Sequence, residues 1–558
     1  MLLSGARIIM ECLLEQGVDT VFGFPGGQIM PLYDALYDYT SDGRVRHVLT
    51  AHEQGATHAA DGYARSTGRV GVCFATSGPG ATNTVTGIAT AYMDSSPIIV
   101  ITGQVPLPSI GRDSFQEVDI VGITLPVVKH SYFCKQAAEL APAVRQAFRI
   151  AASGRPGPVL IDVPKNLMVE SCEYAPAAPL PLDRPPEVSM RDIERLAALI
   201  NGAERPVIYA GGGVVISGAS GELRALAEKS RIPVATTLMC LGAIDRRSPL
   251  SLGMAGMHGE TESNMAVSSS DLLLSIGARF SDRVTGDIPR FAKGAAIAHI
   301  DIDLSEIGKN VASSFSLVGD VREILARLLP LVEENSREEW NGMVRGWKRD
   351  AAPASGGAAG GLGPDEIFAV ARRLLGEDIT IATDVGQHQM WTAQKWPFSN
   401  PRRLITSGGL GTMGFGLGAA IGAQMANPDR RVVLFTGDGS FRMNCVELAT
   451  VSSQGLPIIV FVLKNGTLGM VRQWQKLFFG RRFSATDLPD VIDYPRLAEA
   501  FGLRGWRVGC AAELERAVAE ALEYGRGAVI ACDIDIDENV WPIVPPGDAI
   551  HNQVTGEG

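Results

Sequence analysis

The sequence lacks any uninterrupted apolar run of about 18 residues, the length that a membrane-spanning helix needs. It also lacks a basic first segment followed by an unbroken apolar core, because Glu11 and Glu15 interrupt the apolar spacing near the N-terminus. We therefore expect no membrane span and no signal peptide. Apolar residues at helical spacing instead predict an amphipathic first helix within residues 1–17.

Clustered cysteines and blocks of basic residues are also missing. The eight cysteines form no C-x-x-C pair and no cluster with histidine; they are Cys12, Cys73, Cys134, Cys172, Cys240, Cys445, Cys510 and Cys532. This spacing is typical of reduced thiols and not of a disulfide framework or a zinc site, so we expect a cytoplasmic protein. The net charge of −11, with no basic block to offset it, argues against a nucleic-acid partner.

The sequence does have the length and the apolar content for several cores. It is 558 residues long and 46% hydrophobic, which corresponds to three or four domains. Residues 173–188 are rich in proline and residues 350–364 in glycine and alanine, so both segments are predicted linkers. We therefore predict domains at 1–175, 190–345 and 365–550.

Short apolar runs alternate with helix-length segments in each of these three parts. Examples are "PIIVITG" in the first part, "DLLLSIGA" in the second and "RVVLFTGDGS" in the third. This alternation predicts an α/β fold with three doubly wound parallel sheets. Several runs end in glycine-rich turns, and ligands of such sheets bind at the carboxyl ends of the strands.

Two polar residues in the third part follow neighbouring predicted strands. Asp438 stands between two glycines after one strand, and Asn465 ends the strand 458–463, 27 positions later. A helix near 446–453 and a crossover fit between them, so both oxygens would reach the same sheet edge. Adjacent parallel strands lie about 4.8 Å apart, close enough for the two side chains to share one cation. Each motif alone is an ordinary turn, but together they favour a Mg²⁺ ion bridging the protein to a diphosphate.

This pair resembles the diphosphate–Mg²⁺ motif of thiamine diphosphate enzymes. The resemblance extends over essentially the whole chain and is closest to the FAD-containing, biosynthetic acetolactate synthase (acetohydroxyacid synthase) catalytic subunits. The segments that carry it are "FGFPGGQIMPLYDAL", "AHEQGATHAADGYAR", "SGPGATN", "RPGPVLIDVPK", "GMHG", "ARFSDRVTGD", "HIDID", "DVGQHQMW", "TSGGLGTMGFG", "LGMVRQWQ" and "VPPG". It implies, in chain order, a pyrimidine-binding domain, an FAD-binding domain and a diphosphate/Mg-binding domain.

The resemblance assigns residues to thiamine diphosphate and its metal ion. Asp438 and Asn465 would be side-chain ligands of Mg²⁺, and Thr467 would supply a main-chain oxygen. Glu53, in "AHEQGA", would hydrogen-bond N1′ of the aminopyrimidine and so promote ylid formation, and Met413 would bend the cofactor. The other implied cofactor contacts are Pro25, Gly26, Gly27, Thr76, Asn83, Gly386, Gln387, His388, Gly411, Gly437, Gly439, Ser440, Leu468, Gly469 and Met470.

For FAD, the resemblance implies a cleft in the middle domain that is completed by a residue of the first. The implied contacts are Arg155, Gly211, Gly212, Gly213, Thr237, Leu238, Met239, Met257, His258, Gly277, Ala278, Arg279, Asp282, Arg283, Val284, Asp301, Ile302, Asp320 and Val321. Each glycine alone is more simply a turn residue, so the assignment depends on the set. In this family FAD is not needed for net redox chemistry.

The implied reaction is the decarboxylation of pyruvate and the condensation of the resulting hydroxyethyl carbanion with a second 2-keto acid, pyruvate or 2-ketobutyrate. Gln116, Phe115 and Lys165 would line the site from a second subunit. Arg283 would bind the carboxylate of the second keto acid and Trp474 its alkyl group. The resemblance also implies a homodimer or homotetramer and a small regulatory subunit.

Four positions depart from the family pattern: Lys464 replaces asparagine, Ser281 aspartate, Gln28 alanine and Gly418 proline. Alternatives to the biosynthetic enzyme are pyruvate oxidase, an FAD-free catabolic acetolactate synthase, and a paralogue that binds cofactor without turnover. Glyoxylate carboligase is disfavoured because its relatives lack the glutamate that is Glu53 here.

Overall fold

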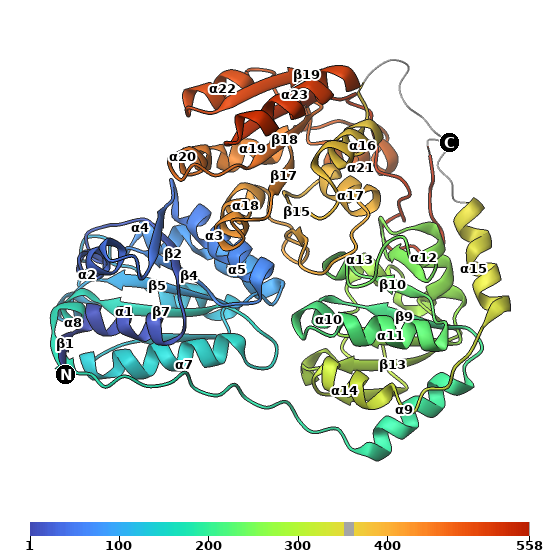
Figure 1. Cartoon of the computed structure of the whole chain (residues 1–558), viewed down its shortest axis with the longest axis horizontal. Coiled ribbons are helices and arrows are strands. Elements are labelled where there is room, and N and C mark those ends of the chain that lie inside the picture. Colours follow the sequence, from blue (N-terminus) through green and yellow to red (C-terminus); the bar gives the residue numbers. More distant parts are fainter. Residues whose placement is uncertain (351–361, 557–558) are drawn as a thin grey trace.

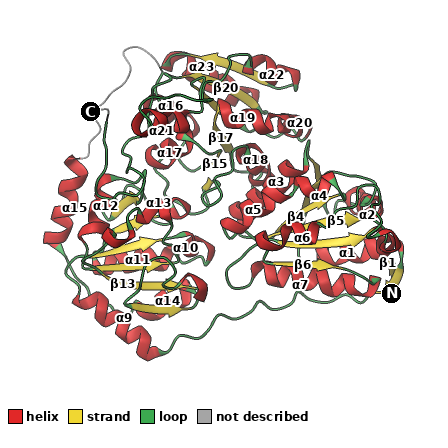
Figure 2. Ribbon diagram, turned by 180° about the vertical axis from the view of Figure 1, so that it is seen from behind, coloured by secondary structure: helices red, strands yellow, loops and turns green. Residues whose placement is uncertain are grey.

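The computed structural model describes residues 1–350 and 362–556, and within them the fold contains three six-stranded sheets. Every strand pair in these sheets is parallel. Helices cover the sheets, and the three units lie around a common centre (Figures 1 and 2). The predicted α/β fold with three parallel sheets is confirmed.

The first unit has the strand order β3-β2-β4-β5-β7-β6. Its strands are β2 (Thr20–Gly23), β3 (Arg46–Leu49), β4 (Gly71–Ala75), β5 (Ile98–Gln104), β6 (His130–Phe133) and β7 (Val159–Pro164). Its helices are α1 (Gly5–Glu15), α2 (Met30–Ser41), α3 (Glu53–Thr67), α4 (Pro79–Asn83), α5 (Val85–Met93), α6 (Ile120–Thr124), α7 (Leu140–Ala152) and α8 (Lys165–Val169). A two-stranded antiparallel sheet joins β1 (Leu2–Ser4) to β8 (Ser171–Glu173).

The second unit has the order β11-β10-β9-β12-β13-β14. Its strands are β9 (Pro206–Ala210), β10 (Val234–Thr236), β11 (Ser251–Met254), β12 (Leu272–Ile276), β13 (Ala296–Asp301) and β14 (Phe315–Val318). Its helices are α9 (Met190–Gly202), α10 (Gly212–Ile216), α11 (Ser220–Ser230), α12 (Thr261–Ser269), α13 (Asp282–Thr285), α14 (Val321–Leu328) and α15 (Glu338–Asp350).

The third unit has the order β16-β15-β17-β18-β20-β19. Its strands are β15 (Thr380–Thr383), β16 (Leu404–Ile405), β17 (Val432–Gly437), β18 (Ile459–Lys464), β19 (Arg504–Val508) and β20 (Ala528–Asp533). Its helices are α16 (Pro364–Leu375), α17 (Gln387–Lys395), α18 (Phe415–Ala426), α19 (Asp438–Asn444), α20 (Leu448–Ser453), α21 (Gly469–Phe478), α22 (Tyr494–Ala500) and α23 (Ala511–Tyr524).

Helix α3 of the first unit packs directly on α18 of the third. A Cβ added to Gly422 would lie 1.8 Å from the carbonyl oxygen of Ala59, and one added to Gly62 would lie 2.1 Å from that of Ala419. The two backbones therefore approach as closely as glycine allows. This contact joins the helix that begins at Glu53 to the third sheet.

Three local predictions need correction. Residues 2–4 form β1, not helix, because the Ser4 side chain accepts the Arg7 N–H and so caps α1. Within the predicted helix 446–453 the first turn is a 3-10 turn, Cys445–Glu447, in which the Glu447 carboxylate accepts the N–H groups of Ala51 and His52. The helix after the Gly-Asp-Gly turn, which the sequence predicts to start near Ser440, is α19 and begins at Asp438 itself.

The first predicted linker, residues 173–188, connects the first and second units. Between β8 and α9 the chain has no helix or strand over residues 174–189. Most of the second predicted linker lies outside the described residues. Within the described ranges, none of the helices combines the length and the apolar character needed to cross a bilayer.

Candidate functional site

The third sheet brings Asp438 and Asn465 to one edge. Strands β17 and β18 pair in parallel with Gly437 opposite Leu463, so the residues that follow emerge side by side. One oxygen of the Asp438 carboxylate accepts the Gly466 N–H at 2.9 Å, and the Asn465 side-chain oxygen accepts the Thr467 N–H at 3.1 Å. The predicted neighbourhood of the two strand ends is confirmed.

Burial shapes the chemistry of this edge. It raises the pKa of Asp438, because the carboxylate loses water while the Gly466 and Gly439 N–H groups compensate only partly. A buried carboxylate with a raised pKa favours a cation beside it. Burial lowers the pKa of His388 to about 3, so the ring is neutral, and its Nε2 has no hydrogen-bond partner among the described residues.

Gln387 orients the amide of Asn465. Its Oε1 accepts from Asn465 Nδ2 at 3.3 Å, while its Nε2 donates to Gln473 Oε1 at 3.1 Å and to the Glu538 carbonyl at 2.8 Å. A Cβ on Gly469 would lie 1.9 Å from Gln387 Oε1 and 2.7 Å from Asn465 Nδ2, so a larger residue there would displace both amides. Asn465 therefore presents its oxygen toward the turn that also contains the Asp438 contact.

These donors suit one kind of metal. The described residues include no group of three His, Cys, Asp or Glu side chains that could hold a metal ion. One carboxylate and one amide instead match Mg²⁺, which takes its remaining oxygens from phosphate groups, main-chain carbonyls and water. The residues present therefore fit a Mg²⁺–diphosphate group.

A second set of predicted residues gathers at the ends of β2 and β4 and the start of α3. Asn83 Nδ2 donates to Glu53 Oε2 at 3.0 Å, and Glu53 is buried. A Cβ on Gly26 would lie 2.5 Å from the Thr76 side chain. Pro25 and Gly27 belong to the same turn between β2 and α2. The first unit therefore presents one buried carboxylate with an amide to orient it.

Gln116 packs against the turn after β4, and Lys165 follows β7. Gln116 adopts a positive φ of 61°, and a Cβ on Gly78 would lie 2.9 Å from its Cα. Lys165 begins α8 directly after β7, and Phe115 is 84% exposed.

A cavity of about 1710 Å³ is lined by residues of all three units. The first unit contributes Arg155, and the second unit contributes most of the predicted FAD residues. The third unit contributes Gly386, Leu410, Gly411, Met470 and Trp474. The predicted FAD residues along it are Gly212, Gly213, Thr237, Leu238, Met239, Met257, His258, Gly277, Arg279, Asp282, Arg283, Val284, Asp301, Ile302, Asp320 and Val321. Gly211 and Ala278 are not among the lining residues; a Cβ on Gly211 would lie 2.2 Å from the Gly277 carbonyl.

Polar atoms without partners occur on the cavity residues. The Tyr209 hydroxyl, the Thr237 hydroxyl and His258 Nδ1 are buried and make no hydrogen bond within the described chain. Buried polar atoms are normally satisfied, so these await a ligand or water. The glycine pair Gly213 and Gly277, with a Cβ of one only 2.7 Å from the Cα of the other, keeps the cleft floor as bare backbone. The lining fits a large nucleotide cofactor.

The large cavity contains only part of the predicted thiamine site. Gly386, Gly411 and Trp474 line the large cavity, whereas Glu53, Asn83, Gln116 and Lys165 are absent from its described lining. Asp438, Asn465 and Thr467 are likewise absent from the described lining, so the cavity reaches neither the Glu53 carboxylate nor the sheet edge with Asp438 and Asn465.

Comparison with known proteins places the chain. Three domains described for thiamine pyrophosphate enzymes match it: the N-terminal TPP binding domain at residues 3–123, the central domain at 193–328 and the C-terminal TPP binding domain at 384–532. The chain is 48% identical over 98% of its length to the acetolactate synthase large subunit of Parasynechococcus marenigrum (strain WH8102), covering 90% of that protein. It is 45% identical over 99% of its length to the acetolactate synthase isozyme 1 large subunit of Escherichia coli (strain K12), covering 98%.

The chain belongs to the acetolactate synthase large-subunit family of thiamine pyrophosphate enzymes. As a member of this family it is a thiamine diphosphate-dependent enzyme. The family resemblance predicted from the sequence motifs is thereby confirmed.

The four residues that depart from the acetolactate synthase pattern lie in different parts of the structure. Lys464 Nζ lies 3.1 Å from a carboxylate oxygen of Asp490 and 3.5 Å from one of Asp533, so its charge is paired beside Asn465. Ser281 lines the large cavity at the start of α13. A Cβ on Gly418 would lie 2.9 Å from the Gly55 carbonyl, on the α3–α18 contact. The backbone N–H of Gln28 donates to Thr76 Oγ1 at 3.2 Å.

Two stretches along the cavity were not predicted from the sequence. Residues 182–185 of the proline-rich segment and residues 93–95 after α5 both line it. Arg155 links these regions to the second unit, donating to Ser95 Oγ at 2.8 Å and to Glu306 Oε1 at 2.8 Å. A proline-rich segment resembles a plain linker, and a short polar turn after a helix has no ligand signature, so nothing local marked either one.

Proposed function

We propose that this chain is the catalytic subunit of an acetolactate synthase. In this proposal it decarboxylates pyruvate and joins the two-carbon unit to a second 2-keto acid, pyruvate or 2-ketobutyrate, in branched-chain amino acid biosynthesis. The observation that carries the proposal is that Asp438 and Asn465 follow neighbouring parallel strands at one sheet edge, in a chain that also buries Glu53 at a helix start. The names of the relatives support it.

In this proposal the third domain, 365–550, holds the diphosphate and Mg²⁺ through Asp438, Asn465 and the Thr467 carbonyl. The first domain, 1–175, holds the pyrimidine, and Glu53 keeps a proton at its ring nitrogen while Asn83 fixes the carboxylate by the 3.0 Å hydrogen bond. Thiamine diphosphate, when bound, supplies the electron sink for decarboxylation and carbon–carbon bond formation. Met413 lies beside the Asp438 turn, with its Cε 3.8 Å from a Cβ built on Gly439.

We assign FAD to the large cavity of the second domain, 190–345. Its volume, its bare glycine floor and its unpartnered polar atoms support this assignment. Asp301 and Asp320, at the carboxyl ends of β13 and β14, are placed to accept hydrogen bonds from sugar hydroxyls. Arg155 contributes a positive charge from the first domain.

We further propose a homodimer or homotetramer with the active site between subunits. Because Glu53 and Gln116 do not line the cavity that contains Trp474, a second copy would supply them, together with Phe115 and Lys165. The relatives are named large subunits, which supports a small regulatory subunit as a further partner. We also place the enzyme in the cytoplasm, since all eight cysteines are free thiols.

A product assay tests the function. Purified protein is incubated with Mg²⁺, thiamine diphosphate and FAD, with pyruvate alone and with pyruvate plus 2-ketobutyrate, and the acidified products are analysed for acetoin and its ethyl homologue. We expect both products. Tight cofactor binding without product would indicate a non-catalytic paralogue, and oxygen consumption in step with pyruvate loss would indicate an oxidase.

A further inference from the structure

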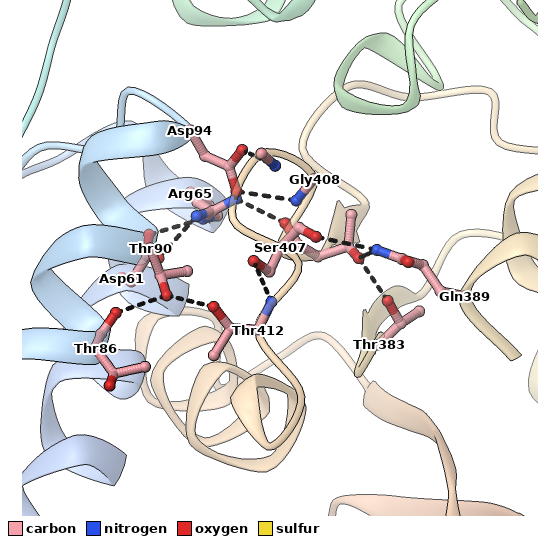
Figure 3. A network of polar contacts seen from close by, with 12 residues as sticks. Asp61, Arg65, Thr86, Thr90, Asp94, Thr383, Gln389, Ser407, Gly408 and Thr412 are labelled. Atoms are coloured by element: carbon pink, nitrogen blue, oxygen red, sulfur yellow. Dashed lines mark hydrogen bonds and ion pairs between the residues drawn. The ribbon is translucent and has the colours of Figure 1, made fainter. Parts of the chain in front are cut away.

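One carboxylate of the first unit binds a loop of the third. Asp94, which follows α5, accepts the Gly408 N–H at 3.0 Å on one oxygen and the Gly409 N–H at 2.7 Å on the other (Figure 3). Its side chain is 1% exposed. The two residues that it holds belong to the segment 406–412, between β16 and α18, which is called the glycine loop below.

Arg65 fixes both the carboxylate and the glycine loop. Its guanidinium pairs with Asp94 at 2.9 Å and with Asp61 at 2.7 Å, and it also donates to the Thr406 carbonyl at 2.7 Å. It lies over the Phe415 ring, 5.1 Å from the centroid. A buried arginine held by two carboxylates has little freedom, so it keeps Asp94 in one orientation.

The glycine loop is also tied to its own sheet. Thr383 Oγ1 and Thr406 Oγ1 lie 2.7 Å apart, and Gln389 Nε2 donates to Thr406 Oγ1 at 2.7 Å. At its other end the Thr412 hydroxyl lies 2.7 Å from that of Thr90 on α5. Figure 3 shows these contacts converging on the loop from both units. The glycine loop is therefore hydrogen-bonded to both the first and the third unit.

Both proposed cofactor positions border this loop. Gly411 is a predicted thiamine diphosphate contact, and Met413 follows one residue after the loop. On its other side, residues 408–411 line the cavity assigned to FAD, and a Cβ on Gly408 would lie 2.5 Å from the sulfur of Met239. A shift of the loop would change both positions at once.

We propose that Asp94 is a positioning residue for both cofactor sites: its carboxylate sets the glycine loop that forms a wall of the FAD cavity and carries the thiamine contacts. The inference rests on the proposed function. It explains why the acceptor has to be a carboxylate, because Asp94 takes hydrogen bonds from three donors, Gly408, Gly409 and Arg65. Asparagine would turn an N–H₂ group toward at least one of these donors.

The test compares two asparagine variants, each of which removes one of the two carboxylates that pair with Arg65. Asp94→Asn loses the ion pair with Arg65 and disturbs the contacts with Gly408 and Gly409, whereas Asp61→Asn loses its own ion pair with Arg65 and touches neither glycine. We measure the affinities for thiamine diphosphate, in excess Mg²⁺, by intrinsic fluorescence, the retention of FAD by flavin release, and the thermal midpoint. Asp94→Asn is expected to weaken the binding of both cofactors about tenfold or more. Asp61→Asn is expected to lower the thermal midpoint similarly while leaving both affinities within about twofold of wild type.

A third variant covers the case in which Asp94→Asn does not fold. Gly409→Ala keeps the ion pairs but adds a Cβ 2.8 Å from Asp94 Oδ1, so the loop has to move away from the carboxylate. It is expected to weaken both cofactors as well. Equal affinity losses in the two asparagine variants, or unchanged affinities in Gly409→Ala, would overturn the proposal. Wild-type protein that binds neither cofactor would instead refute the proposed function.

Discussion

The guanidinium of Arg283 lies over the indole of Trp474, with its Cζ 5.6 Å from the ring centroid. Arg283 comes from α13 of the second unit and Trp474 from α21 of the third, and both line the large cavity. The Arg283 side chain is 62% exposed, and its ion pair with Asp282 is long, at 3.8 Å. A guanidinium so placed keeps donors for a carboxylate, beside an aromatic face that suits a short alkyl group.

This relationship predicts a change in substrate choice. Trp474→Leu removes aromatic surface where the ethyl group of 2-ketobutyrate would pack, so preference for 2-ketobutyrate over pyruvate should fall about three- to tenfold. The measurement is the ratio of the two acetohydroxy acids formed when both keto acids compete. Trp506→Leu, at a half-buried tryptophan of β19 that donates to Glu520, is the matched control and should leave the ratio unchanged. An unchanged ratio in Trp474→Leu would remove this residue from substrate selection.

The contacts of Asn465 and Lys464 predict that substitutions at these adjacent positions affect thiamine diphosphate binding unequally. Asn465→Ala removes a proposed Mg²⁺ ligand and should weaken thiamine diphosphate binding about tenfold or more. Lys464→Ala should do much less, because the lysine is paired with Asp490 and Asp533. Titration of the cofactor at fixed Mg²⁺ measures both. Equal losses would mean that the lysine contacts the diphosphate.

Glu53→Gln should separate catalysis from binding. The amide keeps the size of the side chain but cannot take part in proton transfer at the pyrimidine, so product formation should fall by about 10²- to 10⁴-fold. Cofactor affinity should change much less, because Mg²⁺ and the diphosphate are held by the third domain. Release of CO₂ from pyruvate measures the first quantity and fluorescence titration the second. Near-normal turnover in Glu53→Gln would exclude the acid–base role.

Buried histidine predicts acid lability. Burial lowers the pKa of His58 to about 4, from 6.5 in an exposed histidine. The unfolded state therefore binds more protons between pH 6.5 and 4, so stability from this group is complete above pH 6.5 and is lost as the pH falls toward 4, by on the order of 3 kcal/mol. Thermal midpoints across this range should fall less steeply in His58→Gln than in wild type. His130→Gln, at an exposed site, should keep the wild-type slope; equal slopes for all three proteins would contradict the linkage.

Much of the fold was readable from the chain. The apolar runs "PIIVITG", "DLLLSIGA" and "RVVLFTGDGS" correspond to β5, β12 and β17 of the parallel sheets. The reason is that parallel strands are buried on both faces, so their sequences are continuous apolar runs. Asp438 and Asn465 could be placed together because a βαβ unit puts consecutive strands side by side.

The sequence by itself determined the sheets, the family and the residues that follow each strand, since these depend on local pattern and short connections. The tertiary structure alone decided which surfaces meet. Asp94 and Gly409 are 315 residues apart, and α3 contacts α18 through Ala59 and Gly422. Neither contact has a local signature, because an acid after a helix or a glycine within one is commonplace until the packing of separate domains brings its partner within hydrogen-bond or van der Waals distance.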